Sequence, residues 1–519
     1  MKTIRVAPVI AACVVALLAA GCGGSSSGSG SDTAKLAPDS SFLYAEAALD
    51  PAGAQQAGMR SILGDLPGSG PPEQRLNNLL EQASKSDKSS KVDYLKDVKP
   101  WLGDKAAVFV AGSSQLSAGA KTPWAVVIAT TDEAAARDTI AKDTGSNARK
   151  QTYHGTDYLI DTSNGDTAQG VVDGFLVVGS DAGMKAAIDA SKGQSLSASD
   201  RYKEAIKDAN SDRVALVYED LSGILQAVAG ASGGSLGPAA PLLGRMFGGK
   251  PVVATISAEQ QALVIDGSLV PSGALGSLLG SSTPLVGDAP ADSWLAAGKA
   301  DFGQSLKSLL GLVGGAFGGE QALANKVRSA TGLDIDKDLL GWMGDAAFFV
   351  DGDSKATIGG GALIQSKDPA ASKAALTKLA ALVAKQGGGA QVSAATVGSG
   401  TGYKIVQSSA PRGVFLLQAG DKVALTYGEE AAKAALAGGG LSGAPGFTKA
   451  AGALGAPYLP SLYISAPPIL SLVESLGAGG AGYAKAKPYL TILDYWIAGS
   501  AKDGSTVKSR SRIGFKPGG

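Results

Sequence analysis

Cysteine and histidine are nearly absent from this 519-residue sequence, which contains two cysteines and one histidine. Both cysteines, Cys13 and Cys22, lie near the start, so no disulfide can join distant parts of the chain that follows. The histidine, His154, has no second histidine with which to bind a metal or relay a proton. These shortages argue against thiol catalysis and cysteine–histidine zinc sites, and we expect no metal and no cofactor.

Aromatic residues are also scarce, at 6%, whereas glycine occurs 73 times. Small side chains, leucine and valine must therefore fill most of the interior. Charge of one sign is not in excess either, because Lys+Arg and Asp+Glu both number 46. Nucleic-acid-binding proteins normally present a basic face, so this balance indicates that nucleic acid is not a partner.

The first residues have the three parts of an export signal. Lys2 and Arg5 form a positive end, Val6–Ala20 is apolar, and small residues precede Cys22. The ending L-A-A-G-C resembles the lipobox of bacterial lipoproteins, in which the cysteine receives a diacylglyceryl group and becomes the first residue. This resemblance implies lipidation of Cys22 after removal of the signal. A plain secretory signal cleaved nearby, with Cys22 incidental, is the alternative.

Residues 23–35 begin with G-G-S-S-S-G-S-G-S-D, a composition typical of a flexible tether. A Gly/Ser segment of this length spans roughly 15–20 Å on average. The sequence therefore predicts an extracytoplasmic protein whose folded body is held to the cell membrane by a lipidated N-terminus.

An internal repeat organises the rest of the chain. Residues 93–104 read D-Y-L-K-D-V-K-P-W-L-G-D, and residues 334–345 read D-I-D-K-D-L-L-G-W-M-G-D. We call these two stretches the signature. Its matched residues are Asp93, Asp97, Trp101, Gly103 and Asp104 in the first copy, and Asp334, Asp338, Trp342, Gly344 and Asp345 in the second. The similarity extends on both sides and predicts two homologous domains in tandem, at 36–275 and 284–517.

Short apolar runs separated by turn residues follow each other in both copies. Strands are predicted at 124–130, 151–161 and 170–179, a helix begins at Asp132, and its counterpart begins at Asp368-Pro369. In the first strand, Tyr44 and Glu46 alternate with apolar residues, which is typical of a half-buried strand with these two side chains on its other face. Strands joined mostly by hairpins favour an α+β fold, with a mainly antiparallel sheet and packed helices in each domain.

Three motifs together resemble a known family. They are the opening Pro-Asp-Ser or Pro-Ala-Asp-Ser, the signature, and L-S-x-x-x-x-[YF] at Leu196–Tyr202 and Leu441–Phe447. They resemble the bacterial domain-of-unknown-function family 3352, in both copies. The resemblance implies an exported, lipid-anchored or membrane-tethered envelope protein, and it brings no activity or ligand.

Candidate sites each have a simpler explanation. Gly230–Gly234 fits G-x-S-x-G around Ser232, but such a nucleophile needs a histidine downstream, and His154 lies upstream. Asp334, Asp336, Asp338 and Asp345 have the spacing of a calcium loop, yet the position where such loops need glycine is Leu339 and the bidentate glutamate is absent. We interpret these aspartates as capping residues and the two signature tryptophans as packing anchors.

The sequence therefore predicts a non-enzymatic envelope lipoprotein that binds or scaffolds a partner. A carrier or binder of lipid or another apolar ligand is the alternative, because the chain has apolar Gly/Ala/Leu segments at 227–249 and 309–319. The expected partners are the membrane, through Cys22, and an unidentified envelope protein or apolar ligand.

Overall fold

The computed structural model describes residues 32–517 apart from 69, 76, 79–80, 82–91, 113–121, 145–147, 163–166, 221–250, 270–281, 315–318, 387, 478–479 and 505. Cys22, the tether up to residue 31, and Ser232 lie outside the described residues. The chain divides into two compact units. Unit 1 extends to Leu269 and includes Pro517–Gly519, and unit 2 is Val270–Lys516.

The strands of unit 1 pair antiparallel throughout, in the order β4-β5-β6-β7-β3-β2-β1-β8-β9-β10. Their bounds are β1 Ser41–Ala48, β2 Leu102–Ala111, β3 Trp124–Thr130, β4 Ala148–Tyr153, β5 Thr156–Asp161, β6 Thr167–Val172, β7 Phe175–Ser180, β8 Ala215–Glu219, β9 Val252–Glu259 and β10 Ala262–Leu269.

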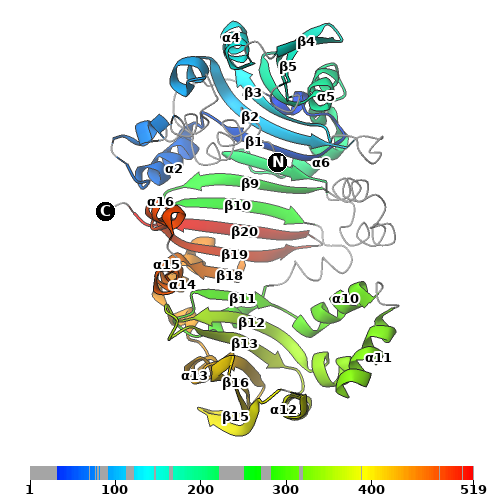
Figure 1. Ribbon diagram of the computed structural model, residues 1–519, viewed down its shortest axis with the longest axis vertical. Helices are drawn as coiled ribbons and strands as arrows, with labels where there is room; N and C mark the ends of the chain where they lie inside the picture. Colours follow the sequence, from blue (N-terminus) through cyan, green and yellow to red (C-terminus); the bar gives the residue numbers. More distant parts are fainter. Residues whose placement is uncertain are drawn as a thin grey trace. The chain divides into compact units, whose positions relative to one another are not determined.

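Unit 2 repeats this arrangement strand for strand, in the order β14-β15-β16-β17-β13-β12-β11-β18-β19-β20, again antiparallel (Figure 1). Its strands are β11 Leu295–Lys299, β12 Met343–Asp351, β13 Gly359–Ser366, β14 Gln391–Val397, β15 Gly400–Gln407, β16 Ala410–Ala419, β17 Lys422–Tyr427, β18 Leu459–Ser465, β19 Leu493–Asp503 and β20 Thr506–Phe515.

Helices lie between the strands of both units. In unit 1 they include α2 Gly53–Gly64, α4 Glu133–Thr144, α5 Asp181–Ser191 and α6 Asp200–Ile206. Those of unit 2 are α10 Phe302–Gly314, α11 Glu320–Thr331, α12 Pro369–Gln386, α13 Glu429–Ala437, α14 Pro445–Leu454, α15 Ala466–Ser475 and α16 Ala481–Leu490. Hairpin-linked strands with packed helices make the fold α+β, as the sequence predicted.

Equivalent aspartates start the helices that follow β3 and β13. A carboxylate oxygen of Asp132 accepts the N–H groups of Ala134 and Ala135, at 2.9 and 3.1 Å. Asp368 accepts two N–H groups in the same way, both at 3.0 Å, and Pro369 occupies the first helical position. These bonds satisfy N–H groups that have no partner inside the helix.

Each sheet is covered on both faces, and each face has its own apolar core. In unit 1, α5 packs on the face that carries Tyr44 and Phe109, and α4 packs on the face that carries Trp101. In unit 2, α13 and α14 pack on the face that carries Phe349, and α12 packs on the face that carries Trp342. We call the last of these the Trp342 face.

Three sequence-based predictions about strands were wrong. The single strands predicted at 151–161 and 170–179 are hairpins, because His154-Gly155 and Asp173-Gly174 form tight turns with φ of 46° and 81° in both cases. Positive φ at both central residues gives the turn whose twist suits a hairpin. The orientation of β1 was also wrong, since Tyr44 is 0% exposed and Glu46 is 9% exposed.

Candidate functional site

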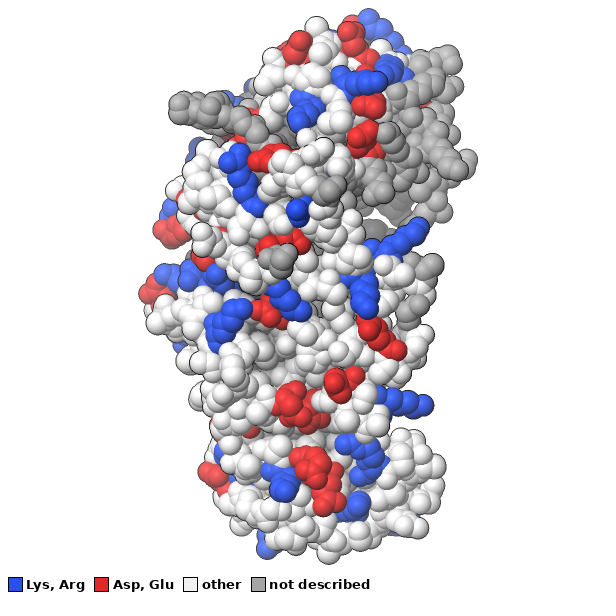
Figure 2. Space-filling model, turned by 90° about the vertical axis from the view of Figure 1, so that its left-hand side faces the viewer, with Lys and Arg blue, Asp and Glu red and all other residues white. Residues whose placement is uncertain are grey.

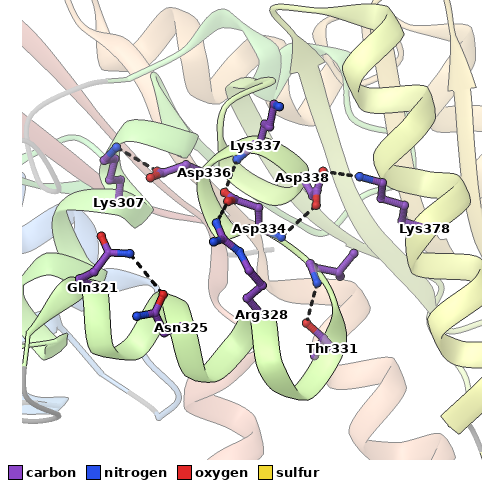
Figure 3. A network of polar contacts seen from close by, with 11 residues as sticks. Lys307, Gln321, Asn325, Arg328, Thr331, Asp334, Asp336, Lys337, Asp338 and Lys378 are labelled. Atoms are coloured by element: carbon purple, nitrogen blue, oxygen red, sulfur yellow. Dashed lines mark hydrogen bonds and ion pairs between the residues drawn. The ribbon is translucent and has the colours of Figure 1, made fainter.

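In unit 2, the signature begins with a tight helical turn, Ile335–Leu340, which the aspartates of the signature hold together (Figure 3). One carboxylate oxygen of Asp334 accepts the N–H of Lys337 at 3.0 Å. A carboxylate oxygen of Asp338 accepts the N–H of Asp334 at 2.9 Å, which closes the turn. The other oxygen of Asp338 accepts from Lys378 of α12 at 2.6 Å.

Helices α10 and α11 contribute the remaining charges around this turn (Figure 3). Arg328 of α11 forms an ion pair with Asp334, and Lys307 of α10 forms one with Asp336 at 2.9 Å. The Arg328 and Lys307 side chains are 56% and 44% exposed, so solvent and salt screen both pairs. Thus each of the three aspartates in the turn has a cationic partner.

The same bonds recur in unit 1, around the turn Tyr94–Val98. Asp93 accepts the N–H of Lys96 at 3.1 Å, and Asp97 accepts the N–H of Asp93 at 2.7 Å. Lys142 of α4 donates to Asp97 at 2.5 Å, as Lys378 does to Asp338. The structure therefore brings the matched signature residues of each unit together in the same arrangement.

The signature tryptophans lie beneath these turns. Trp101 is 1% exposed and Trp342 is 2% exposed. Each indole N–H donates to the backbone carbonyl of the aspartate four residues earlier, Asp97 or Asp338. In unit 1, Trp101 also donates to the hydroxyl of Thr139 at 3.0 Å. Buried indole groups need such acceptors, and the two ring systems fill the centre of the α4 and α12 cores.

Gly103 and Gly344 lie where the neighbouring strand passes too close for a side chain. A Cβ atom at Gly103 would lie 2.7 Å from the carbonyl oxygen of Ala129, and one at Gly344 would lie 2.8 Å from that of Gln365.

The last aspartates of the two signatures make different hydrogen bonds. Asp345 accepts the Thr283 hydroxyl at 2.6 Å and the Asp301 N–H at 3.0 Å. Its counterpart Asp104 accepts the N–H of Leu49 through its backbone carbonyl at 2.7 Å.

Hydrogen bonds keep the turn carboxylates ionised. The bond from Lys378, and then the N–H of Asp334, lower the pKa of Asp338. The N–H of Lys337 is the largest influence lowering the pKa of Asp334. For Asp97, burial acts to raise the pKa, but the bonds from Lys142 and the Asp93 N–H outweigh it and the pKa is lowered. Carboxylates with lowered pKa values stay ionised, so they pair well with the protein's own cations and are poor proton acceptors.

No group of three metal-binding side chains that could hold an ion occurs among the described residues. The acids with calcium-loop spacing have other partners, and Asp336 corresponds to Leu95 in unit 1. His154 lies at a hairpin tip, 56% exposed at its side chain and 3.6 Å from Asp189. The candidate nucleophile Ser232 lies outside the described residues.

Sequence reasoning missed a buried polar cluster in unit 1. A carboxylate oxygen of Glu46 accepts the Tyr44 hydroxyl at 3.0 Å, and the other accepts from Arg213 at 3.0 Å. The hydroxyls of Thr33 and Tyr44 lie 2.7 Å apart. Unit 2 has Gly298 at the position of Glu46, as the matching strand registers show, so this cluster belongs to unit 1. The sequence feature that could have revealed this cluster is Glu46, an acidic residue within an otherwise mostly apolar strand.

A second buried acid, Asp351, ends β12 in unit 2 and is 6% exposed. Burial, and then the negative charge of Asp292, raise the pKa of Asp351 to about 6, although Arg412 acts in the opposite direction. Arg412 itself donates to the carbonyl of Ile358 and lies over the Tyr427 ring. In unit 1 the matching position is Ala111, so this acid also belongs to one unit.

The family described as "Protein of unknown function (DUF3352)" matches residues 3–472. The chain belongs to this family. The DUF3352 match is one continuous stretch that includes both signatures, and it carries no activity or ligand. No curated protein matches the sequence. The solved structure titled "Structure of crystal form I of TP0453" is similar over 47% of this DUF3352 chain and 80% of that chain, at 9% identity. Its TM-score of 0.25 is too low for any argument about fold or function.

Basic and acidic side chains of the DUF3352 protein are interspersed on the described part of the face in Figure 2. No helix in the parts of the chain that the structure describes combines the length and apolar character needed to cross a membrane.

Proposed function

We propose that this protein is a non-enzymatic lipoprotein of the bacterial cell envelope, anchored through Cys22 and acting as a binding or scaffolding module. The observation that carries this proposal is the leader itself, in which an apolar stretch ends in L-A-A-G-C and a Gly/Ser tether follows. A tether is useful to a protein whose body must stay near a membrane without entering it.

The start of the folded body supports this interpretation of the tether. Thr33 falls inside the segment predicted as a tether, 23–35, but it begins a short helical turn and is 0% exposed, and Leu36 is 1% exposed. The Thr33 hydroxyl bonds to Tyr44 inside unit 1. The folded body thus includes residues 33–36, so a flexible tether formed by the Gly/Ser residues 23–31 would hold unit 1 within roughly 15–20 Å of the anchor on average.

We further propose that the two units are homologous repeats, and that the signature has a structural role in each. Support comes from the shared strand order and from the pairs Lys142–Asp97 and Lys378–Asp338, which close equivalent turns. Because these acids bond to the protein's own N–H and ammonium groups, their retention in both copies needs no ligand to explain it. The absence of a suitable histidine in the sequence supports the non-enzymatic part of the proposal.

A second candidate function, binding of lipid or another apolar ligand, is favoured by the Trp342 face of unit 2. Phe348 and Trp496 are 38% and 42% exposed, although their strands are paired on both sides. The register places Trp496 opposite Ile464, and Ile464 opposite Leu295, so these side chains share one face. Large apolar side chains exposed together on a sheet commonly bind apolar partners.

Membrane fractionation tests the anchor. The wild-type protein should sediment with membranes, and Cys22→Ser should release it into the soluble fraction. Cys13→Ser is the matched control and should leave it anchored. Retention of the Cys22→Ser variant with membranes would overturn lipid anchoring.

Native mass spectrometry of the protein released by Cys22→Ser separates the two functions. A bound apolar molecule that survives purification supports the carrier function. Its absence, together with co-purification of a defined envelope protein after cross-linking in cells, supports the scaffolding function.

A further inference from the structure

The Trp342 face of unit 2 is apolar and incompletely covered over β12, β11, β18 and β19, which lie side by side (Figure 1). The apolar side chains on this part of the face are half-buried or exposed, namely Leu295, Ala297, Phe348, Ile464 and Trp496. Those that alternate with them on the opposite face are at most 4% exposed, namely Ala296, Tyr463 and Ile497. One side of these strands therefore belongs to a closed core, and the other presents apolar side chains to solvent.

Two lysines lie at one end of this apolar surface. Lys299 follows Leu295 and Ala297 on the same side of β11, because residues two apart in a strand share a face. Lys502 lies on the same side of β19 as Trp496, roughly 20 Å further along the strand. The positive charge of Lys502 acts on Lys299, so the two ammonium groups are near each other. The surface is thus apolar along its length and positive at one end.

The surroundings of Lys299 suit the binding of an anion. Burial lowers the pKa of Lys299; Asp301 and Asp345 act in the opposite direction, and Lys502 acts in the same direction as burial. The two acids have other partners, since Asp301 pairs with Lys367 at 3.0 Å and its N–H donates to Asp345 at 3.0 Å. An anion between the two lysines would offset their mutual repulsion and the cost of burying the charge of Lys299.

The equivalent surface of unit 1 lacks these lysines. The strand registers place Ala47 at the position of Lys299 and Ala258 at that of Lys502. Helix α2 closes this end of the surface in unit 1, where a Cβ atom at Gly58 would lie 2.3 Å from the Ala258 carbonyl oxygen. The two units, although alike in strand order, therefore differ in this feature, and the apolar surface with a positive end belongs to unit 2.

We propose that this surface binds a long-chain fatty acid. The carboxylate lies between Lys299 and Lys502. The acyl chain lies along β11, β18 and β19, over Leu295, Ile464 and Trp496. This proposal rests on the second candidate function, because it names the ligand of the same apolar face.

A fatty acid matches the surface in both of its parts. It has one compact anionic group at the end of one apolar chain, as the surface has two cations at the end of an apolar stretch. Burial of the chain against the sheet supplies most of the binding free energy. The bonds from ammonium groups to the carboxylate are charge-assisted, so they add affinity and fix the direction of the chain.

Fluorescence titration with cis-parinaric acid and with its methyl ester tests the site, using the full chain carrying Cys22→Ser. The two probes share one chain, and only the acid is charged. The acid should bind about ten-fold more tightly than the ester. Lys299→Met and Lys502→Met should each weaken binding of the acid by about three- to ten-fold and leave binding of the ester unchanged.

Lys449→Met is the matched control for the lysine variants. Lys449 belongs to α14, which covers the opposite face of the sheet, and it pairs there with Asp494 at 2.7 Å. This variant should bind both probes as the parent does. Trp496→Ala should weaken both probes, since it removes apolar contact area and no charge. If Lys299→Met does not fold, Lys502→Met decides, because the Lys502 side chain is exposed.

The outcomes separate the fatty-acid site from the carrier function on which it rests. Equal binding of acid and ester, unaffected by either lysine variant, would overturn the fatty-acid site and leave binding of an apolar ligand standing. Binding of neither probe would overturn both. Displacement of the acid by vesicles of dioleoylphosphatidylglycerol but not by palmitate would assign the surface to a phospholipid and overturn its assignment to a fatty acid.

Discussion

The ammonium nitrogen of Lys378 lies 2.6 Å from a carboxylate oxygen of Asp338, which ties helix α12 to the signature turn of unit 2. Lys142 and Asp97 make the same connection in unit 1, at 2.5 Å. In both units the lysine comes from the helix that covers the signature tryptophan. The pair therefore positions the turn over the tryptophan, and its effect on stability can be measured in each unit.

We expect Lys378→Ala to lower the free energy of unfolding of unit 2 by about 0.5–1 kcal/mol at pH 7, the usual range for an exposed pair of good geometry. The pKa of Asp338 is lowered chiefly by Lys378, so this stabilisation is complete above the ordinary value of 3.8 and disappears as pH falls through the lower folded-state pKa. Urea denaturation at pH 7 and pH 3 measures it. Lys373→Ala, an exposed lysine on the same helix, is the control and should have no such effect.

The close approach of strands at the signature glycines gives a second prediction. Gly344→Ala places a Cβ atom 2.8 Å from the Gln365 carbonyl oxygen and should destabilise unit 2 by about 1–3 kcal/mol, because the backbone must move. Gly452→Ala in α14 meets nothing within 4 Å and should be neutral or stabilising, by up to about 1 kcal/mol. Thermal unfolding of both variants tests this, and equal melting temperatures would contradict it.

The α+β fold and the cap residues could be predicted from local sequence. Asp132 and Asp368 precede apolar helical stretches, and such caps need only residues a few positions away. A turn was predicted at His154-Gly155, but the one at Asp173-Gly174 was missed because it interrupts a run that otherwise looks continuous. A two-residue turn changes composition very little, yet it reverses the chain.

The orientation of β1 could not be predicted from period-two alternation. Alternation assigns one face to solvent, but this sheet is covered on both faces, and Glu46 is buried because Arg213, 167 residues away, pairs with it. Contacts between residues so distant in sequence leave no local pattern. For the same reason, the lysine partners of Asp97 and Asp338 were not predicted, although the turn acids themselves were.

The Glu46–Arg213 pair supplies a third prediction. Arg213→Met leaves the Glu46 carboxylate buried with Lys105, at 4.0 Å, as its nearest cation. We expect a loss of about 3 kcal/mol, because an uncompensated buried charge is costly. Glu46→Gln removes that charge, so the double variant should recover part of the loss. A double-mutant cycle by urea denaturation measures the coupling, and strictly additive losses would show that the two residues do not stabilise each other.

Asp351 should make unit 2 more stable in acid than at neutral pH, which is opposite to the effect of Asp338. Its pKa is raised to about 6 in the folded protein, mainly by burial, from an ordinary value of 3.8. The folded state therefore binds the Asp351 proton more tightly than the unfolded state does. As pH rises from 3.8 to about 6, Asp351 ionises more readily in the unfolded state, and this difference lowers the free energy of unfolding.

Asp351→Asn removes this penalty. We expect the variant to exceed the wild type in unfolding free energy at pH 7 by on the order of 2 kcal/mol, and this excess should shrink toward pH 4. Because other carboxylates titrate in the same range, the quantity to measure is the difference between variant and wild type at each pH. Asp292→Asn should reduce the difference without abolishing it, since the charge of Asp292 is a smaller influence than burial. A difference that does not change with pH would mean that Asp351 stays ionised in the folded protein throughout this range.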